Sequence, residues 1–192
     1  MKVILVHGWD GYPKNCWFPW LKKELEKRKF EVKVPKMPNP SKPVIRDWVS
    51  YLSKIAVGAD SNTYFVGHSV GCQAILRYLE KSGKSVGGAV FVAGWFTLKN
   101  LETIEEKAIA KPWIETPIDL YKVRRTARNF TAILSNNDPF VPFKRTKRIF
   151  EGKLGAKIIA ESKKGHFTDD DGVTELPSAL ESVLKMSAKK KK

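Results

Sequence analysis

Short apolar runs alternate with segments of helical spacing along this chain, and this alternation limits the folds that it can adopt. The runs are rich in β-branched and aromatic residues and cover residues 2–6, 31–34, 63–66, 88–92, 130–134 and 156–160. Helical spacing covers residues 17–29, about 43–57, 70–82, 143–151 and 174–186. Strands that are apolar almost throughout and alternate with helices are typical of a parallel sheet with helices on both faces. Because crossovers between parallel strands are right-handed, the sequence predicts an α/β fold with a doubly wound, mostly parallel sheet.

Two segments that contain proline interrupt this alternation. Residues 96–118 include Pro112 and Pro117, and we expect irregular backbone with short helical patches there. This segment is the only candidate for a lid, and it is small. Residues 35–43, PKMPNPSKP, are expected to form a loop that leaves the second strand, although a polyproline ligand for a partner protein is an alternative.

The chain is long enough to bury one sizeable core. At 192 residues it falls within the usual range of a single domain, which we place at residues 1–187. Residues 188–192, AKKKK, are expected to form a basic, disordered tail. No stretch approaches the ~20 apolar residues of a membrane helix, and His7 and Gly8 break the first apolar run too soon for a signal peptide. We therefore expect a cytoplasmic protein that does not associate with membranes.

Cysteine is scarce in the sequence. Cys16 and Cys72 are too few for a disulfide framework, and they lack metal-ligand spacing. We expect both to be buried free thiols and expect no metal site.

The net charge of +15 raises the question of an anionic partner such as a nucleic acid. Four of the positive charges belong to the terminal lysine run, and the others are scattered among glutamates, as in LKKELEKRK. Such mixing is typical of a solvated surface, and the chain lacks a nucleic-acid-binding motif. We do not expect nucleic-acid binding, and a polyanion site at the lysine tail is the alternative.

A glycine-flanked serine, Ser69 in GHSVG, follows the third apolar run. The pattern G-x-S-x-G is typical of a sharp turn between a strand and a helix, where the serine at the apex adopts a strained conformation. Gly67 and Gly71 would be required because side chains at these two positions would clash across the turn. The alternative is a glycine-rich turn that binds nothing.

Two further polar residues follow predicted strands. Asp138 comes just after the fifth strand, in SNNDPFVP, and His166 comes after the sixth, in ESKKGHF. Ligand sites of doubly wound sheets form beyond the carboxyl ends of the strands, so Ser69, Asp138 and His166 can meet there. The order serine, acid, histidine is the one found in α/β-hydrolases.

Alternatives exist for the acid and for the base. Asp138 could simply cap its proline turn, in which case the acid would come from Asp169, Asp170 or Asp171, directly after His166. His166 could be a surface histidine. His7 and His68 are poor candidates for the base, because we expect His68 to point away from Ser69 and His7 to order the loop after the first strand.

The motifs VHGWDG, WFPWLKKEL, GHSVG, AVFVAGWF, SNNDPFVP and GHF together resemble the α/β-hydrolases, specifically the retinoblastoma-binding protein 9 and YdeN family of small serine hydrolases. The resemblance spans nearly the whole chain. It implies six strands in the order 2-1-3-4-5-6. It also implies that the backbone N–H of Trp9 is one oxyanion donor, with Asp10 as the alternative.

These residues suggest a division of roles. Ser69 would be the nucleophile, His166 the general base, and Asp138 the residue that orients the imidazole. The backbone N–H of Val70 would be the other oxyanion donor. Trp95 follows the fourth strand and is the best candidate for a substrate pocket, with plain core packing as the alternative. Trp17 and Trp20 of the first helix are expected to pack in the core or to line the pocket.

The sequence therefore predicts a serine hydrolase that cleaves a small ester, thioester or activated amide through an acyl-enzyme, without a cofactor. Its partner would be a small acyl substrate. The alternative is a protein with the hydrolase fold that works mainly as a binding partner for other proteins. The sequence lacks the pocket-protein motif L-x-C-x-E, and Cys72 lies between Gly71 and Gln73.

Overall fold

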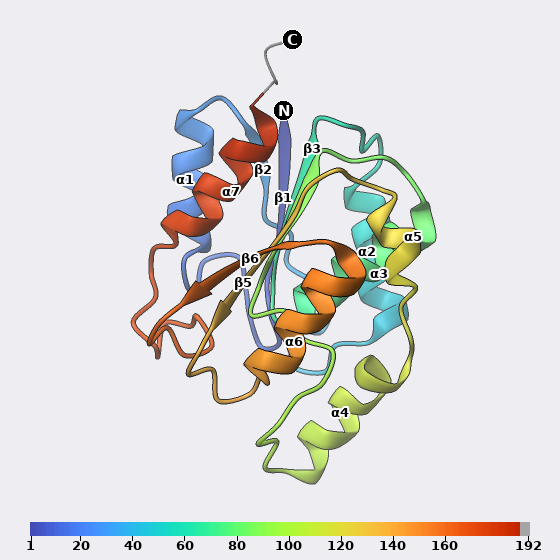
Figure 1. Ribbon diagram of the computed structural model, residues 1–192, viewed down its shortest axis with the longest axis vertical. Helices are drawn as coiled ribbons and strands as arrows, with labels where there is room; N and C mark the ends of the chain where they lie inside the picture. The colour runs from blue at the N-terminus through green and yellow to red at the C-terminus, as the bar shows by residue number, and fades with distance from the viewer. Residues whose placement is uncertain (189–192) are drawn as a thin grey trace.

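A six-stranded parallel sheet forms the centre of the molecule (Figure 1). The computed structural model describes residues 1–188. The strand order is β2-β1-β3-β4-β5-β6, which confirms the predicted fold class and strand order. The strands are β1 (Lys2–Val6), β2 (Glu31–Lys33), β3 (Thr63–His68), β4 (Gly88–Val92), β5 (Phe130–Ser135) and β6 (Lys157–Glu161).

Helices cover both faces of the sheet, as the apolar strands require. The helices are α1 (Phe18–Lys27), α2 (Ile45–Ile55), α3 (Val70–Ser82), α4 (Ile104–Glu115), α5 (Leu120–Arg124), α6 (Phe143–Ile149), the π-helical turn η1 (Phe150–Leu154) and α7 (Pro177–Ser187). In Figure 1, α1 and α7 lie on one face, and α2, α3, α5 and α6 lie on the other. Each face has its own apolar cluster, so the three central strands β3, β4 and β5 are buried along their whole length.

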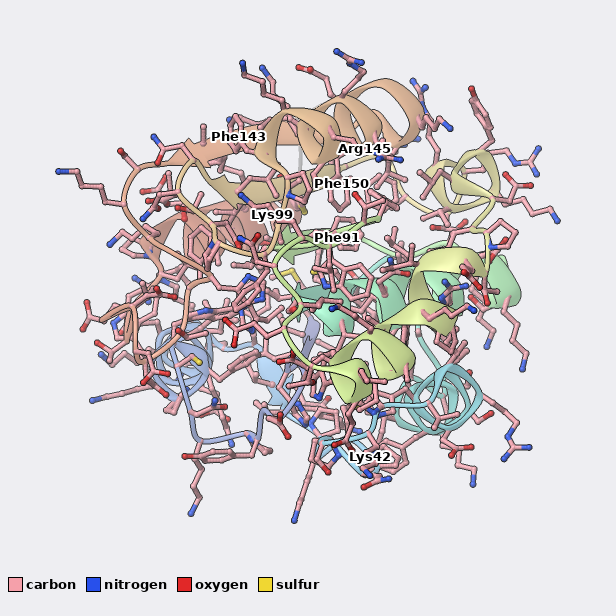
Figure 2. All side chains as sticks on the ribbon, turned by 90° about the horizontal axis from the view of Figure 1, so that it is seen from below. Lys42, Phe91, Lys99, Phe143, Arg145 and Phe150 are labelled. Carbon is pink, nitrogen blue, oxygen red and sulfur yellow. The ribbon has the colours of Figure 1, made fainter. Side chains whose placement is uncertain are left out.

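The central strands end at the same edge of the sheet. His68 at the end of β3 pairs with Val92 of β4, and Val92 pairs with Ile133 of β5. Figure 2 views this edge, with Lys99 on the loop that leads from β4 into α4. Because the strands are parallel, the turns that follow them converge at this edge, where ligand sites of such sheets form.

The segment that we expected to be irregular, residues 96–118, contains a regular helix. Helix α4 runs from Ile104 to Glu115, and Pro112 lies within it. Its amino end has a capping box, in which the Thr103 side chain accepts from the N–H of Glu106 while the Glu106 carboxylate accepts from the N–H of Thr103. The prediction was wrong because two capping hydrogen bonds stabilise the first turn and offset the lost donor of the proline.

The other boundaries agree with the sequence prediction to within about three residues, which is the usual uncertainty for helix and strand ends. The short helix α5 was not predicted, because five residues carry too little periodicity to be recognised. Among residues 1–188, the structure has no helix that is long and apolar enough to cross a membrane. The four lysines of the predicted tail, residues 189–192, lie outside the described residues.

The two tryptophans at the first helix differ in burial, whereas both cysteines are buried. Trp17 is fully buried, as expected of a core residue, whereas Trp20 is half-buried at the margin of the same apolar cluster. Cys16 and Cys72 are both buried and free, which confirms the prediction for the thiols. Burial raises the pKa of the Cys16 thiol to about 11.

Candidate active site

The turn from β3 into α3 places Ser69 in a conformation that most residues avoid. Its φ of 52° and ψ of −121° are strained for a residue with a side chain. A Cβ atom on Gly71 would collide with the carbonyl oxygens of Val6 and His7, and one on Gly67 would lie 2.8 Å from the backbone nitrogen of Cys72. Gly71 is therefore required for the close approach of α3 to the end of β1, and Gly67 for the close approach of α3 to β3.

Three side chains from separate turns form a continuous hydrogen-bonded chain. The Nε2 atom of His166 lies 2.9 Å from Oγ of Ser69, and its Nδ1 atom lies 2.8 Å from Oδ2 of Asp138. Since a carboxylate only accepts, Nδ1 of the neutral ring carries the proton and Nε2 is free to accept from the serine hydroxyl. Ser69 is 8% exposed and the Asp138 side chain is fully buried. The predicted trio is thus brought together with the geometry of a Ser-His-Asp triad.

The turn after β5 fixes the second oxygen of the Asp138 carboxylate. Its Oδ1 atom accepts from the backbone N–H groups of Phe140 at 2.9 Å and Val141 at 3.0 Å. The carboxylate therefore caps its own turn and holds the histidine at the same time. The two readings of this residue that the sequence left open are both compatible with its geometry.

The competing aspartates after His166 have other partners. Asp169 accepts from the backbone N–H of Cys16 at 2.8 Å. Asp171 accepts from the backbone N–H groups of His166 and Thr168 and from the Thr168 hydroxyl. Neither carboxylate has a hydrogen bond to the imidazole ring of His166 within the described part of the chain. The geometry thus favours Asp138 as the acid.

His68 contacts the loop of His166, a feature that the sequence did not indicate. Its Nε2–H donates to the backbone carbonyl of His166 at 2.7 Å, and the two ring centroids lie 5.2 Å apart. Burial, together with a smaller effect of the neighbouring His166, lowers the pKa of His68 to about 3. We expected the side chain to point away from Ser69; its ring is hydrogen-bonded to the His166 loop, and His68 is among the residues that line the pocket. No sequence pattern pairs a histidine with a backbone carbonyl 98 residues away.

His7 orders the loop after β1, as expected. Its Nδ1–H donates to the carbonyl of Gly8 at 2.9 Å, and its Nε2 accepts from the N–H of Met37 at 2.9 Å. Burial lowers the pKa of His7, which favours the neutral ring that this pair of bonds requires. The ring therefore fixes the path of the backbone that leads to Trp9.

Backbone donors are available beside the nucleophile. Val70 is the first residue of α3, where N–H groups have no partner within the helix. The N–H of Asp10 donates to the carbonyl of Pro40 at 2.9 Å, whereas the N–H of Trp9 has no acceptor among residues 1–188. Of the two candidates in this loop, Trp9 is thus the one whose donor is not already occupied.

A cavity of about 270 Å³ opens onto the serine. Its walls come from the loop after β1, the turn at Ser69, the loop before α4, the start of α4 and the turns that carry Asp138 and His166. They are largely apolar and include Trp9, Trp95, Leu98, Leu101 and Phe140. The indole N–H of Trp95 reaches the nucleophile itself, since its Nε1 lies 3.3 Å from Oγ of Ser69.

A parallel sheet in this strand order, with a serine at the sharp turn into the following helix, places the chain in the α/β-hydrolase class. The model of the serine hydrolase family matches residues 3–185, and the chain belongs to this family. It is 35% identical to YdeN of Bacillus subtilis (strain 168) over 178 residues, which are 92% of this chain and 90% of YdeN. It is 25% identical to serine hydrolase RBBP9 of Rattus norvegicus over 186 residues, which are 95% of each chain.

Solved structures agree with this assignment. The crystal structure of the ydeN gene product from B. subtilis matches with a TM-score of 0.87 at 31% identity, over 96% of this chain and 97% of that chain. Est1E from Butyrivibrio proteoclasticus matches with a TM-score of 0.75 at 13% identity, over 98% of this chain and 88% of that chain, which is a likeness of fold alone. The resemblance stated from the sequence motifs is confirmed.

Proposed function

We propose that the protein hydrolyses small esters, thioesters or activated amides through an acyl-enzyme on Ser69. The hydrogen-bonded chain from Asp138 through His166 to Ser69 is the observation that carries this proposal. A serine hydroxyl is a weak nucleophile until a base removes its proton, and Nε2 of His166 lies 2.9 Å from that hydroxyl.

The acylation step uses each of these groups. Ser69 Oγ bonds to the acyl carbon while its proton passes to Nε2 of His166, and the carbonyl π electrons move onto the carbonyl oxygen. The backbone N–H groups of Trp9 and Val70 stabilise that oxyanion. The bond to the leaving group then breaks, and the proton on His166 goes to the leaving group.

Deacylation repeats these steps with water as the nucleophile. The water oxygen bonds to the acyl carbon as His166 takes a proton, and the carbon–Oγ bond then breaks. The electron pair returns to Oγ of Ser69 and the proton returns from His166. Asp138 stabilises the imidazolium in both halves of the cycle and keeps its own charge.

The size and the lining of the cavity favour a small substrate. Its volume of about 270 Å³ lies near the lower end of the range for ligand pockets, and its aromatic walls suit an apolar or aromatic acyl group. A series of p-nitrophenyl esters with graded acyl chains would define the preference. We expect kcat/KM to fall for chains too long for this cavity.

A fluorophosphonate probe and a set of variants test the proposal. The probe should label the wild-type protein on Ser69 and should not label Ser69→Ala. Ser69→Ala and His166→Ala should each lower ester turnover by about three to six orders of magnitude, and Asp138→Asn by about four.

The matched control is Asp169→Asn, which alters a carboxylate near His166 in sequence that bonds to the backbone of Cys16 instead of the ring. This variant should keep near-normal turnover. Near-normal turnover by Asp138→Asn would show that the acid is assigned wrongly, and unlabelled wild-type protein would contradict the proposed function.

A further inference from the structure

The nucleophile has a second side-chain partner besides His166. Trp95 follows β4, is only 1% exposed, and directs its indole N–H at Oγ of Ser69 over 3.3 Å. The other fully buried indoles of the described chain differ in this respect. Trp48 and Trp113 donate to the backbone carbonyls of Pro38 and Pro43, and Trp17 has no acceptor within residues 1–188.

A buried polar network holds Trp95 in this place. The Nε2 atom of Gln73 donates to the carbonyl of Trp95 at 2.7 Å, and Gln73 is itself 1% exposed. The Oε1 atom of Gln73 accepts from Nη2 of Arg77 at 3.3 Å, and Nη2 also donates to the carbonyl of Thr116 at 2.8 Å. The backbone of Trp95 is thus anchored to α3, the helix that begins at the nucleophile.

The two contacts divide the hydrogen-bonding capacity of the serine hydroxyl. Its hydrogen points to Nε2 of His166, one lone pair accepts from the indole of Trp95, and the second lone pair remains for attack. An N–H···O distance of 3.3 Å is long, so this bond is weak while the oxygen is neutral. Charge-assisted hydrogen bonds are shorter and stronger, so it strengthens as Oγ becomes anionic.

We propose that Trp95 is a catalytic residue that donates its indole N–H to Oγ of Ser69 whenever that oxygen carries developing negative charge. This inference rests on the proposed function. In acylation the charge develops as the Oγ proton moves to His166 and the bond to the acyl carbon forms. In deacylation it develops as the carbon–Oγ bond breaks and the electron pair returns to Oγ, before His166 returns the proton. Trp95 keeps its own proton throughout.

This role differs from that of the oxyanion donors. The N–H groups proposed for Trp9 and Val70 stabilise the carbonyl oxygen of the substrate, whereas Trp95 acts on the oxygen of the enzyme. An interaction that is weak in the ground state and strong in the transition state accelerates the chemical step. The loss of Trp95 should therefore lower both chemical rate constants, and it should not act mainly on substrate binding.

Pre-steady-state kinetics with p-nitrophenyl acetate measure the two steps separately. The burst of p-nitrophenol reports acylation of Ser69 and the steady phase reports deacylation. Trp95→Phe keeps an aromatic wall and removes the donor. We expect both rate constants to fall by about tenfold or more, with a much smaller change in KM. Trp113→Phe is the matched control, since it also removes a buried indole donor but one that bonds to the carbonyl of Pro43, and it should keep both rates.

A second variant separates the donor from the shape of the ring. Benzothienylalanine, introduced at position 95 by amber suppression, keeps the fused rings and replaces the N–H with sulfur. It should show the same loss as Trp95→Phe, and it decides the question if Trp95→Phe does not fold. Rates equal to those of Trp113→Phe, or a change confined to KM, would overturn the role of Trp95 while leaving the proposed function intact. Wild-type protein with no burst and no fluorophosphonate label on Ser69 would overturn both.

Discussion

The buried imidazole of His68 should make the stability of the fold depend on pH. Its Nε2–H donates to the carbonyl of His166 at 2.7 Å, and burial lowers its pKa to about 3. Three titratable groups also act on the pKa of His68: His166 and His7 lower it, and Asp138 raises it. In the unfolded chain the same ring has a pKa near ~6.5. Unfolding therefore takes up one proton at this residue between the two values.

The sign of the effect follows from this proton. Because the folded pKa lies below the unfolded one, the contribution of His68 is fully present above about pH 6.5 and falls as the pH drops toward 3. Between about pH 7.5 and about pH 5 the folded ring stays neutral while the unfolded ring becomes protonated. Integration of the linkage relation over this interval gives a loss of about 2 kcal/mol in unfolding free energy from His68 alone.

Urea denaturation of wild-type protein and His68→Gln at these two pH values measures this contribution. Glutamine has an amide N–H that can reach the carbonyl of His166, and it does not titrate. His7 and the other ionisable groups are present in both proteins, so their contributions cancel in the difference. We expect the wild-type protein to lose about 2 kcal/mol more than the variant on acidification. An equal loss in both proteins would refute a buried neutral ring at position 68.

Two further substitutions test local features of the site. Gly71→Ala would place a methyl carbon against the carbonyl oxygens of Val6 and His7, so we expect about 1–3 kcal/mol of destabilisation in thermal or urea unfolding. It should also greatly slow fluorophosphonate labelling of Ser69. Labelling of the variant at the wild-type rate would contradict the close packing inferred for this turn. Thr103→Ala removes the acceptor for the N–H of Glu106 and should cost α4 about 1 kcal/mol, seen as faster hydrogen exchange in its first turn. Unchanged exchange there would mean that the capping box does not stabilise the helix.

The fold was predictable because its signals are local and repeated. Each strand is indicated by a short run of apolar residues, and right-handed crossovers leave few ways to arrange parallel strands. The meeting of Ser69, Asp138 and His166 was predictable for a related reason. All three lie within five residues of the end of a strand, and parallel strands bring whatever follows them to one edge of the sheet.

The supporting contacts were not predictable in the same way. The bond from Trp95 to Ser69 depends on the direction of a side chain after β4, and nothing in the sequence fixes that direction. In helix α4 two local signals conflict, since TIEE carries the capping-box pattern at Thr103 and Glu106 whereas Pro112 is typical of irregular backbone. Local capping and side-chain direction are decided by contacts that the periodicity of a sequence does not encode.

The position of the base illustrates what these contacts contribute. The two residues on either side of His166 have positive φ, Gly165 at 49° and Phe167 at 61°, a conformation that is unfavourable for phenylalanine. Hydrogen bonds on three sides offset this cost: Asp138 holds the ring, His68 holds the carbonyl and Asp171 holds the N–H. Because a misplacement of about 1 Å can cost about a hundredfold in rate, an imidazole on an unsupported loop would be a poor base. His68 and Asp171, which lie outside the proposed triad, therefore help to fix the position of its histidine.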